Sequence, residues 1–222
     1  MITPPCWAEI IRPYQAIYGT EWQVGLRLSG TAESSLKRDQ QGYWRLHTEA
    51  STKFTNFTES SRFSLQQQQL VPLEYFHQRQ VLNRSHLVRL TFNWQQGQVL
   101  NMVNDRSWHM PITPGTYDKQ TVQLQLRRDL MAHQTDLSYT VADDGRLEVF
   151  AYQVEAEESL ETPLGRLHTI RVKRDRGTNS TRNTWIWFAP QYQFMIVRVE
   201  QHETSGRRYL LNLQQLTWLD WP

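Results

Sequence analysis

Histidines are the residues of this sequence best able to bind a metal ion, and their spacing does not suit a metal site. None of the seven follows the pattern His-x-His or His-Glu-x-x-His, the spacings that place two imidazoles on one ion. The single cysteine, Cys6, excludes an intramolecular disulfide and a cysteine-rich zinc site. The sequence therefore predicts no metal and no cofactor, although a site assembled from histidines on distant strands stays open.

Residues suited to covalent or acid-base catalysis are present but are not arranged for it. The sequence has no Gly-x-Ser-x-Gly nucleophile motif and no glycine-rich phosphate loop between a strand and a helix. Of the two carboxylate pairs, Asp143-Asp144 precedes Gly145 as a turn would, and Glu157-Glu158 adjoins the end of a strand. These patterns predict a protein that is not an enzyme, and catalysis by scattered residues is kept as a third hypothesis.

Five basic side chains around a turn at Gly177 form the strongest charge feature: Arg171, Lys173, Arg174, Arg176 and Arg182. Successive side chains of a strand point to opposite faces, so Arg171 and Lys173 would face water while Ile170 and Val172 face the core. A solvated strand face explains this pattern. The alternative is that the five residues contact anionic lipid head groups or an acidic partner protein.

Aromatic residues are abundant, with nine Trp, nine Tyr and eight Phe. Six of them are candidates for an apolar ligand site: Trp44, Trp94, Trp108, Tyr152, Trp185 and Trp187. The same residues would also suit a solid core. If the sheet curls, its inward-facing aromatic residues would line a pocket with a helix as its lid, as in small ligand-carrying barrels.

Strands must position most of these residues, because turn signals recur at short intervals along the chain. Segments with period-two alternation lie between the turns, for example residues 86–93, where Val88, Leu90 and Phe92 share one face. The segment 184–188 is apolar on both faces, which predicts cover on both sides or a cavity wall. This pattern is typical of a mainly β meander, sandwich or barrel of about ten strands.

One segment departs from the strand pattern. Val122, Leu126 and Leu130 recur at four-residue spacing, which is typical of a helix. Asp118 precedes this segment and is a good N-cap, since its carboxylate can accept backbone N–H groups of the first turn. The sequence therefore predicts one main helix that begins just after Asp118.

Composition and charge indicate the number of domains and make nucleic-acid binding and membrane spanning improbable. The 222 residues, 39% of them hydrophobic, suffice for one β domain, which we place at residues 14–222 after an amino-terminal segment at residues 1–13. A formal charge of +2 is too weak to indicate a nucleic-acid partner. No run approaches the roughly 18 apolar residues of a membrane-spanning helix, so the chain is predicted not to span a membrane.

Seven short segments occur along the chain in a fixed order. Each is a weak signal of a protein family, but their order and spacing together are more specific. They are residues 14–19 (YQAIYG), 30–32 (GTA), 70–75 (LVPLEY), 91–94 (TFNW), 114–118 (PGTYD), 158–165 (ESLETPLG) and 185–190 (WIWFAP). In these segments the chain resembles the bacterial exported domain of unknown function 3108 family, from near Tyr14 to near Leu216. Asn93 stands where the family often has Asp, and Met195-Ile196 stands where a Pro-Val step is usual, but both changes keep strand character.

The family has no assigned activity, so the resemblance bears on fold and localisation. It implies an exported, periplasmic, mainly β protein: a single antiparallel sheet curled into an open barrel or half-barrel, with one main α-helix. Such a sheet is similar to the half-barrels that carry lipoproteins and lipids through the envelope, which is an analogy at the level of the fold.

Localisation and function follow as expectations. The start of the sequence, Met1 to Pro5, lacks the charged residues and the apolar run of a signal peptide, so we expect a periplasmic protein whose export signal was removed before the first numbered residue. The preferred hypothesis is a non-catalytic periplasmic protein that binds or carries an apolar or lipid-like ligand. The alternative is a structural or protein-interaction module of the bacterial cell envelope, with an envelope protein as its partner.

Overall fold

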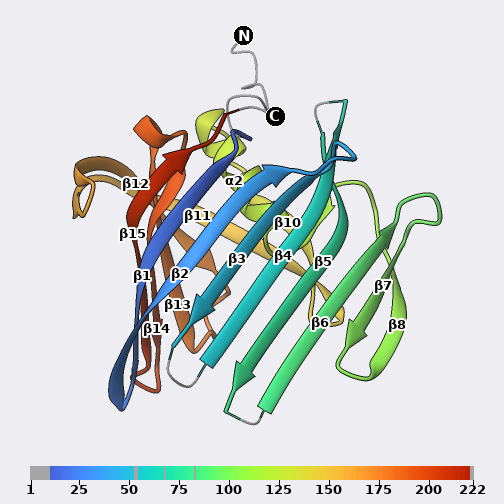
Figure 1. The fold of residues 1–222 in the computed structure, drawn as a ribbon, viewed down its shortest axis with the longest axis horizontal. Helices are drawn as coiled ribbons and strands as arrows, with labels where there is room; N and C mark the ends of the chain where they lie inside the picture. The colour runs from blue at the N-terminus through green and yellow to red at the C-terminus, as the bar shows by residue number, and fades with distance from the viewer. Residues whose placement is uncertain (1–10, 53–54, 68, 83, 221–222) are drawn as a thin grey trace.

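A single sheet of fifteen strands dominates the computed structural model, which describes residues 11–52, 55–67, 69–82 and 84–220 (Figure 1). The strands are β1 (Tyr14–Val24), β2 (Leu26–Arg38), β3 (Trp44–Ser51), β4 (Thr55–Gln66), β5 (Gln69–Val81), β6 (Arg84–Asn93), β7 (Gln98–Val103), β8 (Arg106–Pro111), β9 (Thr116–Tyr117), β10 (Ser138–Asp143), β11 (Arg146–Thr162), β12 (Gly165–Asp175), β13 (Arg182–Ala189), β14 (Met195–Glu203) and β15 (Arg208–Trp218). The helical elements are α2 (Thr121–Met131) and the short 3-10 helix η1 (Pro190–Tyr192). Residues 1–10 of the expected amino-terminal segment lie outside the described residues.

The expectation of about ten strands was too low. Several turns are made by residues other than glycine that adopt a positive φ, such as Gln67 at 48°, Leu82 at 52° and Asn104 at 51°. A positive φ is uncommon for a residue with a side chain, so these turns have no glycine to mark them in the sequence. The sequence pattern therefore does not separate the strands on either side of these turns, and too few strands were predicted.

The strands form two meanders that are joined where β1 pairs with β15. Their order in the sheet is β8-β7-β6-β5-β4-β3-β2-β1-β15-β14-β13-β12-β11-β10-β9. Neighbouring strands are antiparallel except β9 and β10, which are parallel. A parallel pair needs a crossover connection, and α2 supplies it between these two strands. The predicted antiparallel sheet is thus confirmed except at this pair.

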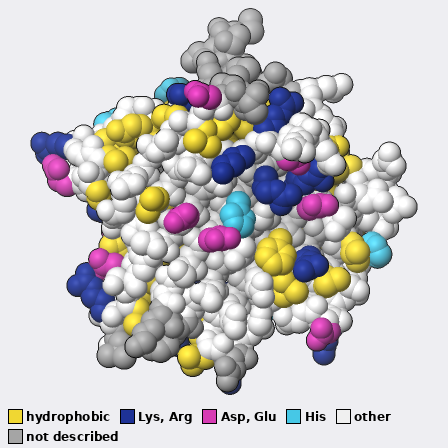
Figure 2. Space-filling model, in the orientation of Figure 1, with side chains coloured by type: hydrophobic (Ala, Val, Ile, Leu, Met, Phe, Trp, Pro, Cys, Tyr) yellow, Lys and Arg dark blue, Asp and Glu magenta, His cyan; other side chains and the backbone are white. Residues whose placement is uncertain are grey.

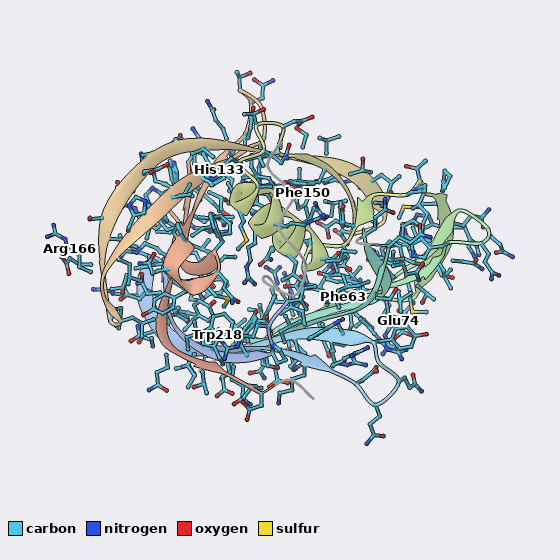
Figure 3. All side chains as sticks on the ribbon, turned by 90° about the horizontal axis from the view of Figure 1, so that it is seen from above. Phe63, Glu74, His133, Phe150, Arg166 and Trp218 are labelled. Atoms are coloured by element: carbon cyan, nitrogen blue, oxygen red, sulfur yellow. The ribbon has the colours of Figure 1, made fainter. Side chains whose placement is uncertain are left out.

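The sheet curls around α2 into an open barrel, which Figure 3 shows from above. Register shifts interrupt four strand pairings, between residues 17 and 18, 62 and 63, 154 and 156, and 187 and 188. Such bulges bend a strand and increase its twist. The edge strands β8 and β9 do not pair with each other, so the sheet is curled but not closed. The predicted fold class, an open barrel or half-barrel with one main helix, is confirmed.

The β10–β11 turn contacts strands from the other end of the sheet through the Gly145 backbone and the Asp144 side chain. Trp108 donates its indole N–H to the Gly145 carbonyl oxygen at 3.1 Å, and His86 Nε2 lies 3.1 Å from Oδ1 of Asp144. Gly145 has a φ of +85°, and a Cβ at this residue would lie 2.1 Å from the Trp108 ring. Glycine is therefore required here, and the contact holds the two halves of the curl together.

The predicted helix is present, and its apolar stripe faces the sheet. Val122, Leu126 and Leu130 are buried in one hydrophobic cluster with Phe150 and Phe188. Phe150 comes from β11 and Phe188 from β13, so α2 covers the concave face of the second meander. Figure 3 shows α2 inside the curl, with Phe150 labelled beside it.

The start of α2 differs from the prediction by two residues. The N-cap is Gln120, which makes no side-chain capping hydrogen bond. Asp118 nevertheless accepts hydrogen bonds at Oδ1 from the backbone N–H groups of Gln120, at 2.8 Å, and Thr121, at 3.0 Å. Its carboxylate therefore binds the N–H of the residue just before the helix and the N–H of the first helical residue, although Asp118 itself lies two residues outside the N-cap.

The same carboxylate ties the helix to the first meander. The Ser61 hydroxyl on β4 donates to Asp118 Oδ2 at 2.7 Å, and both residues are fully buried. Gln120 Nε2 donates to Thr48 Oγ1 on β3 and to the Glu59 carbonyl oxygen on β4, each at 3.3 Å. The helix therefore spans the curl, packing on one half of the sheet and hydrogen-bonding to the other.

Candidate ligand cavity

The concave face of the sheet and α2 enclose a cavity of about 650 Å³. Its walls come from β1 to β5 on one side and from β13 to β15 on the other. In Figure 1, α2 lies near the upper end of the curl, and the β1–β2 and β14–β15 turns lie at the lower end. Cross-strand pairing sorts the lining residues into three belts, which follow one another from α2 toward those turns.

The deep belt lies under α2 and is largely polar. Its polar residues are Tyr14, Ser34, Thr48, Glu59, Gln120, Gln123 and Arg127. Ser34 pairs with Thr48, and Thr48 pairs with Glu59 across the strands. The Thr48 hydroxyl donates to Ser34 Oγ at 3.3 Å, and the Ser34 and Tyr14 hydroxyl oxygens lie 3.4 Å apart. Most of these polar groups therefore satisfy one another.

Two charged groups of the deep belt also have partners. The Glu59 carboxylate accepts a hydrogen bond from the Tyr75 hydroxyl. Burial raises the pKa of Glu59, while the Lys119 ammonium and this hydrogen bond act in the opposite direction. Arg127 on α2 is buried and donates from Nη2 to the Gln193 carbonyl oxygen at 3.0 Å.

The middle belt is apolar and contains the hollow. It consists of Tyr18, Ala32, Ala50, Phe57, Ile196, Val199 and Leu211. Ala32 pairs directly with Ala50, and Ala50 with Phe57, so two methyl side chains lie next to each other where larger ones would fill the space. The Tyr18 hydroxyl donates to the Ile196 carbonyl oxygen at 3.0 Å. Because its polar end is bonded, Tyr18 adds an aromatic ring to an apolar wall.

The mouth lies at the end of the cavity opposite α2. It consists of Trp22, Arg182, Gln201, Glu203, Arg207, Arg208 and Tyr209, together with Arg79, which pairs with Phe57 of the middle belt near the end of β5. Trp22 and Tyr209 pair across β1 and β15 with their ring centroids 4.7 Å apart. Arg182 Nη2 lies 3.1 Å from Glu203 Oε1. All four arginines of the mouth are exposed to solvent, so the cavity is open at this end.

Within the described part of the chain, none of the six predicted aromatic residues lines this cavity. Trp44 is buried in the core, Trp94 donates its indole N–H to the Pro72 carbonyl oxygen, and Trp108 binds Gly145. Tyr152 lies against Tyr139, with 6.1 Å between ring centroids. Ligand binding by the six stays a prediction; the aromatic lining of the cavity is Tyr14, Tyr18, Trp22, Phe57 and Tyr209.

Trp185 and Trp187 lie on the outer face of β13. They alternate with Ile186 and Phe188, which pack in the cluster around α2. Each indole N–H donates to a glutamate of β11: Trp185 to Glu155 Oε2 at 3.1 Å and Trp187 to Glu158 Oε1 at 2.7 Å. The segment 184–188 is therefore covered on both faces, as its sequence predicts.

The five predicted basic residues are divided between the two faces of the sheet. On the outer face, Arg171 pairs with Glu155 and Glu158, and Lys173 Nζ lies 5.8 Å from the Trp185 ring centroid. The outward orientation of these two residues agrees with the sequence, since Val172 is buried. Contact of the five with an anionic surface stays a prediction.

The other three basic residues lie on the inner face. The Arg174 guanidinium lies over the Phe150 ring, Arg176 Nη1 donates to Thr184 Oγ1 at 3.0 Å, and Arg182 lines the mouth. Burial, together with Arg174 and Arg182, lowers the pKa of Arg176 to about 10. Positive charge is thus concentrated around the β12–β13 turn on the side of the cavity.

The structure shows neither a metal centre nor a membrane-spanning helix in the residues it describes. These residues contain no group of three or more His, Cys, Asp or Glu side chains that could hold a metal ion. They also contain no helix that is long and apolar enough to cross a membrane.

The fold and the cavity define a class of protein: a curled β-sheet that surrounds an internal cavity and carries one covering helix. The chain belongs to the family described as a protein of unknown function, DUF3108, which matches residues 13–212. The resemblance of its sequence segments to this family is confirmed. No curated protein matches the chain.

A beta-barrel-like protein of the domain of unknown function DUF1849 from Brucella abortus has a similar structure. The TM-score is 0.64 at 8% sequence identity, over 95% of this chain and 99% of that chain, which shows a shared fold. A DUF1329 family protein from Desulfovibrio piger aligns over 97% of this chain and 94% of that chain, with 10% identity and a TM-score of 0.30. A LolA superfamily protein from Nitrosomonas europaea aligns over 97% of this chain and 91% of that chain, with 10% identity and a TM-score of 0.27.

Proposed function

We propose that the protein is a non-catalytic binding or carrier protein of the periplasm that holds an apolar or lipid-like molecule in its cavity. The observation that carries this proposal is the cavity itself. A volume of about 650 Å³ lies within the roughly 300–1,000 Å³ typical of small-molecule sites. The apolar middle belt supplies the surface that such a ligand would cover, and the exposed mouth gives it a route of entry.

Filling the middle belt is the sharpest test of this proposal. In Ala50→Trp, the indole would occupy the hollow next to Ala32, so we expect binding of the uncharged dye N-phenylnaphthylamine to weaken by at least about tenfold. The melting temperature should change little, because the added ring enters existing space rather than a packed core. Dye titration followed by fluorescence, together with a thermal melt of the same sample, measures both quantities.

Ser51→Trp is the matched control, since Ser51 is the next residue of β3 and its side chain is exposed. It adds the same ring to the opposite face and should leave dye binding unchanged. Equal binding by Ala50→Trp and the wild type would place the dye outside the cavity. A wild-type protein that binds no dye would favour the alternative, an interaction module of the envelope.

Export is part of the proposal and rests on the resemblance of the sequence segments to an exported family. In the native organism, fractionation should recover the protein in the periplasm. Native mass spectrometry of that material would then show whether a lipid is released from it. Recovery of the protein from the cytosol alone would contradict periplasmic localisation.

A further inference from the structure

We propose that the cavity binds a single-chain amphiphile with an anionic head group, a carboxylate or a phosphate. Its chain lies in the middle belt and its head group lies among the arginines of the mouth. This inference rests on the proposed function of the cavity, and it adds the chemical class of the ligand and the direction in which it lies.

The charge of the mouth is the first argument. Its charged residues are four arginines and one glutamate. Glu203 pairs with Arg182, whereas no carboxylate of the described residues lies within 4.0 Å of the side-chain nitrogens of Arg79 or Arg207. Arg208 pairs with His202, and its side chain is on the outer face of β15. The two exposed guanidinium groups of Arg79 and Arg207 at the rim of one cavity thus have no ionic partner in the described part of the chain. Guanidinium binds carboxylate and phosphate through paired N–H groups, which favours an anionic head group.

The deep belt is a poor place for such a head group. Ser34, Thr48 and Gln120 are hydrogen-bonded to one another, and Arg127 donates to Gln193. A second carboxylate in this belt would lie near Glu59, where two negative charges in a buried site repel each other. The anionic end of a ligand is therefore expected at the mouth, where water and arginine are both available.

The aromatic residues and the length of the cavity fit this orientation. Trp22 and Tyr209 lie between the apolar belt and the arginines, the position that these amphipathic rings prefer between apolar and aqueous surroundings. Tyr14 and Trp22, at the two ends of the lining, are separated along β1 by about 26 Å, from eight steps of roughly 3.3 Å. One leaflet of a bilayer core is about 15 Å thick. An extended acyl chain therefore fits between the deep belt and the mouth.

The test compares ligands that share one acyl chain and differ in head group. Palmitate and lysophosphatidate carry an anionic head, monopalmitoyl glycerol an uncharged one, and palmitoylcholine a cationic one. We expect calorimetric titration of the full chain, below micelle-forming concentrations, to show about tenfold tighter binding of both anionic ligands than of monopalmitoyl glycerol. Palmitoylcholine should bind more weakly than monopalmitoyl glycerol. The anionic preference should shrink at high salt, because the arginines are exposed.

The double variant R79Q/R207Q should abolish most of this preference while leaving the affinity for monopalmitoyl glycerol unchanged. The matched control is R106Q/R166Q, which removes two exposed arginines that do not line the cavity and should keep the preference. Equal wild-type affinities for palmitate and monopalmitoyl glycerol, or an equal weakening of both by R79Q/R207Q, would overturn the head-group proposal alone. Binding of none of these ligands would instead refute the proposed function of the cavity.

Discussion

Replacing Asp118 with alanine should lower the free energy of unfolding by about 3 to 5 kcal/mol. The Asp118 side chain is fully buried and accepts hydrogen bonds from the Ser61 hydroxyl and from the backbone N–H groups of Gln120 and Thr121. Each buried donor left without a partner costs about 1–3 kcal/mol. The total exceeds the ~1 kcal/mol of an ordinary helix cap, because Asp118 also joins α2 to β4. Urea denaturation of the variant and the wild type measures the difference.

Three further variants separate the parts of this effect. Asp118→Asn keeps one acceptor oxygen and should cost less than the alanine variant. Ser61→Ala removes a single donor and should cost about 1–2 kcal/mol. Asp136→Ala changes an exposed aspartate outside this network and should stay within about 0.5 kcal/mol of the wild type. An alanine variant as stable as Asp136→Ala would show that Asp118 does not anchor the helix.

Trp187→Ala should also destabilise the fold by about 3 to 5 kcal/mol, with no effect on ligand binding while the protein is folded. The Trp187 side chain is buried on the outer face of β13 and donates its indole N–H to Glu158. Removing it leaves a cavity in the core and takes one hydrogen bond from Glu158, which keeps its ion pair with Arg171. The middle belt lies on the other side of the sheet and keeps its lining. Chemical denaturation and dye titration of the same preparation measure both quantities.

Trp185→Ala is the matched control for this prediction. Trp185 lies two residues away on the same face and also donates to a glutamate, but it is only half-buried. Its loss should cost clearly less stability. Weaker dye binding by folded Trp187→Ala, at a stability close to that of the wild type, would show that Trp187 binds the ligand instead of supporting the core.

The sequence predicts the fold well where the signal is local. Alternating polarity marks strands such as β6, and the four-residue spacing of Val122, Leu126 and Leu130 marks α2. The start of α2 was placed two residues early: Asp118 does bind the N–H of the first helical residue, Thr121, but it also binds Ser61 on β4 and lies outside the helix. Contacts between residues that are distant in the sequence leave no local pattern.

The cavity was predicted as a possibility, but its lining was not. Alternation shows that Trp185 and Trp187 share a face, but it does not show which face of the sheet is concave. The hollow arises where Ala32 and Ala50 pair, and small residues give no signal until their strands are placed side by side. Of the residues proposed from the sequence for binding or contact, only Arg182 lines the cavity in the described part of the chain.

The pairing of the first strand with the last has a consequence for the order of folding. Tyr14 pairs with Trp218, about 200 residues later, and this β1–β15 ladder joins the two meanders. Each meander can form from neighbours in sequence, but contacts between distant segments close slowly because the intervening chain must first be ordered. The ladder is therefore expected to form late, after the last strand has left the ribosome. Because the two walls of the cavity belong to different meanders, a chain that lacks β15 would have no binding site even if each half folded.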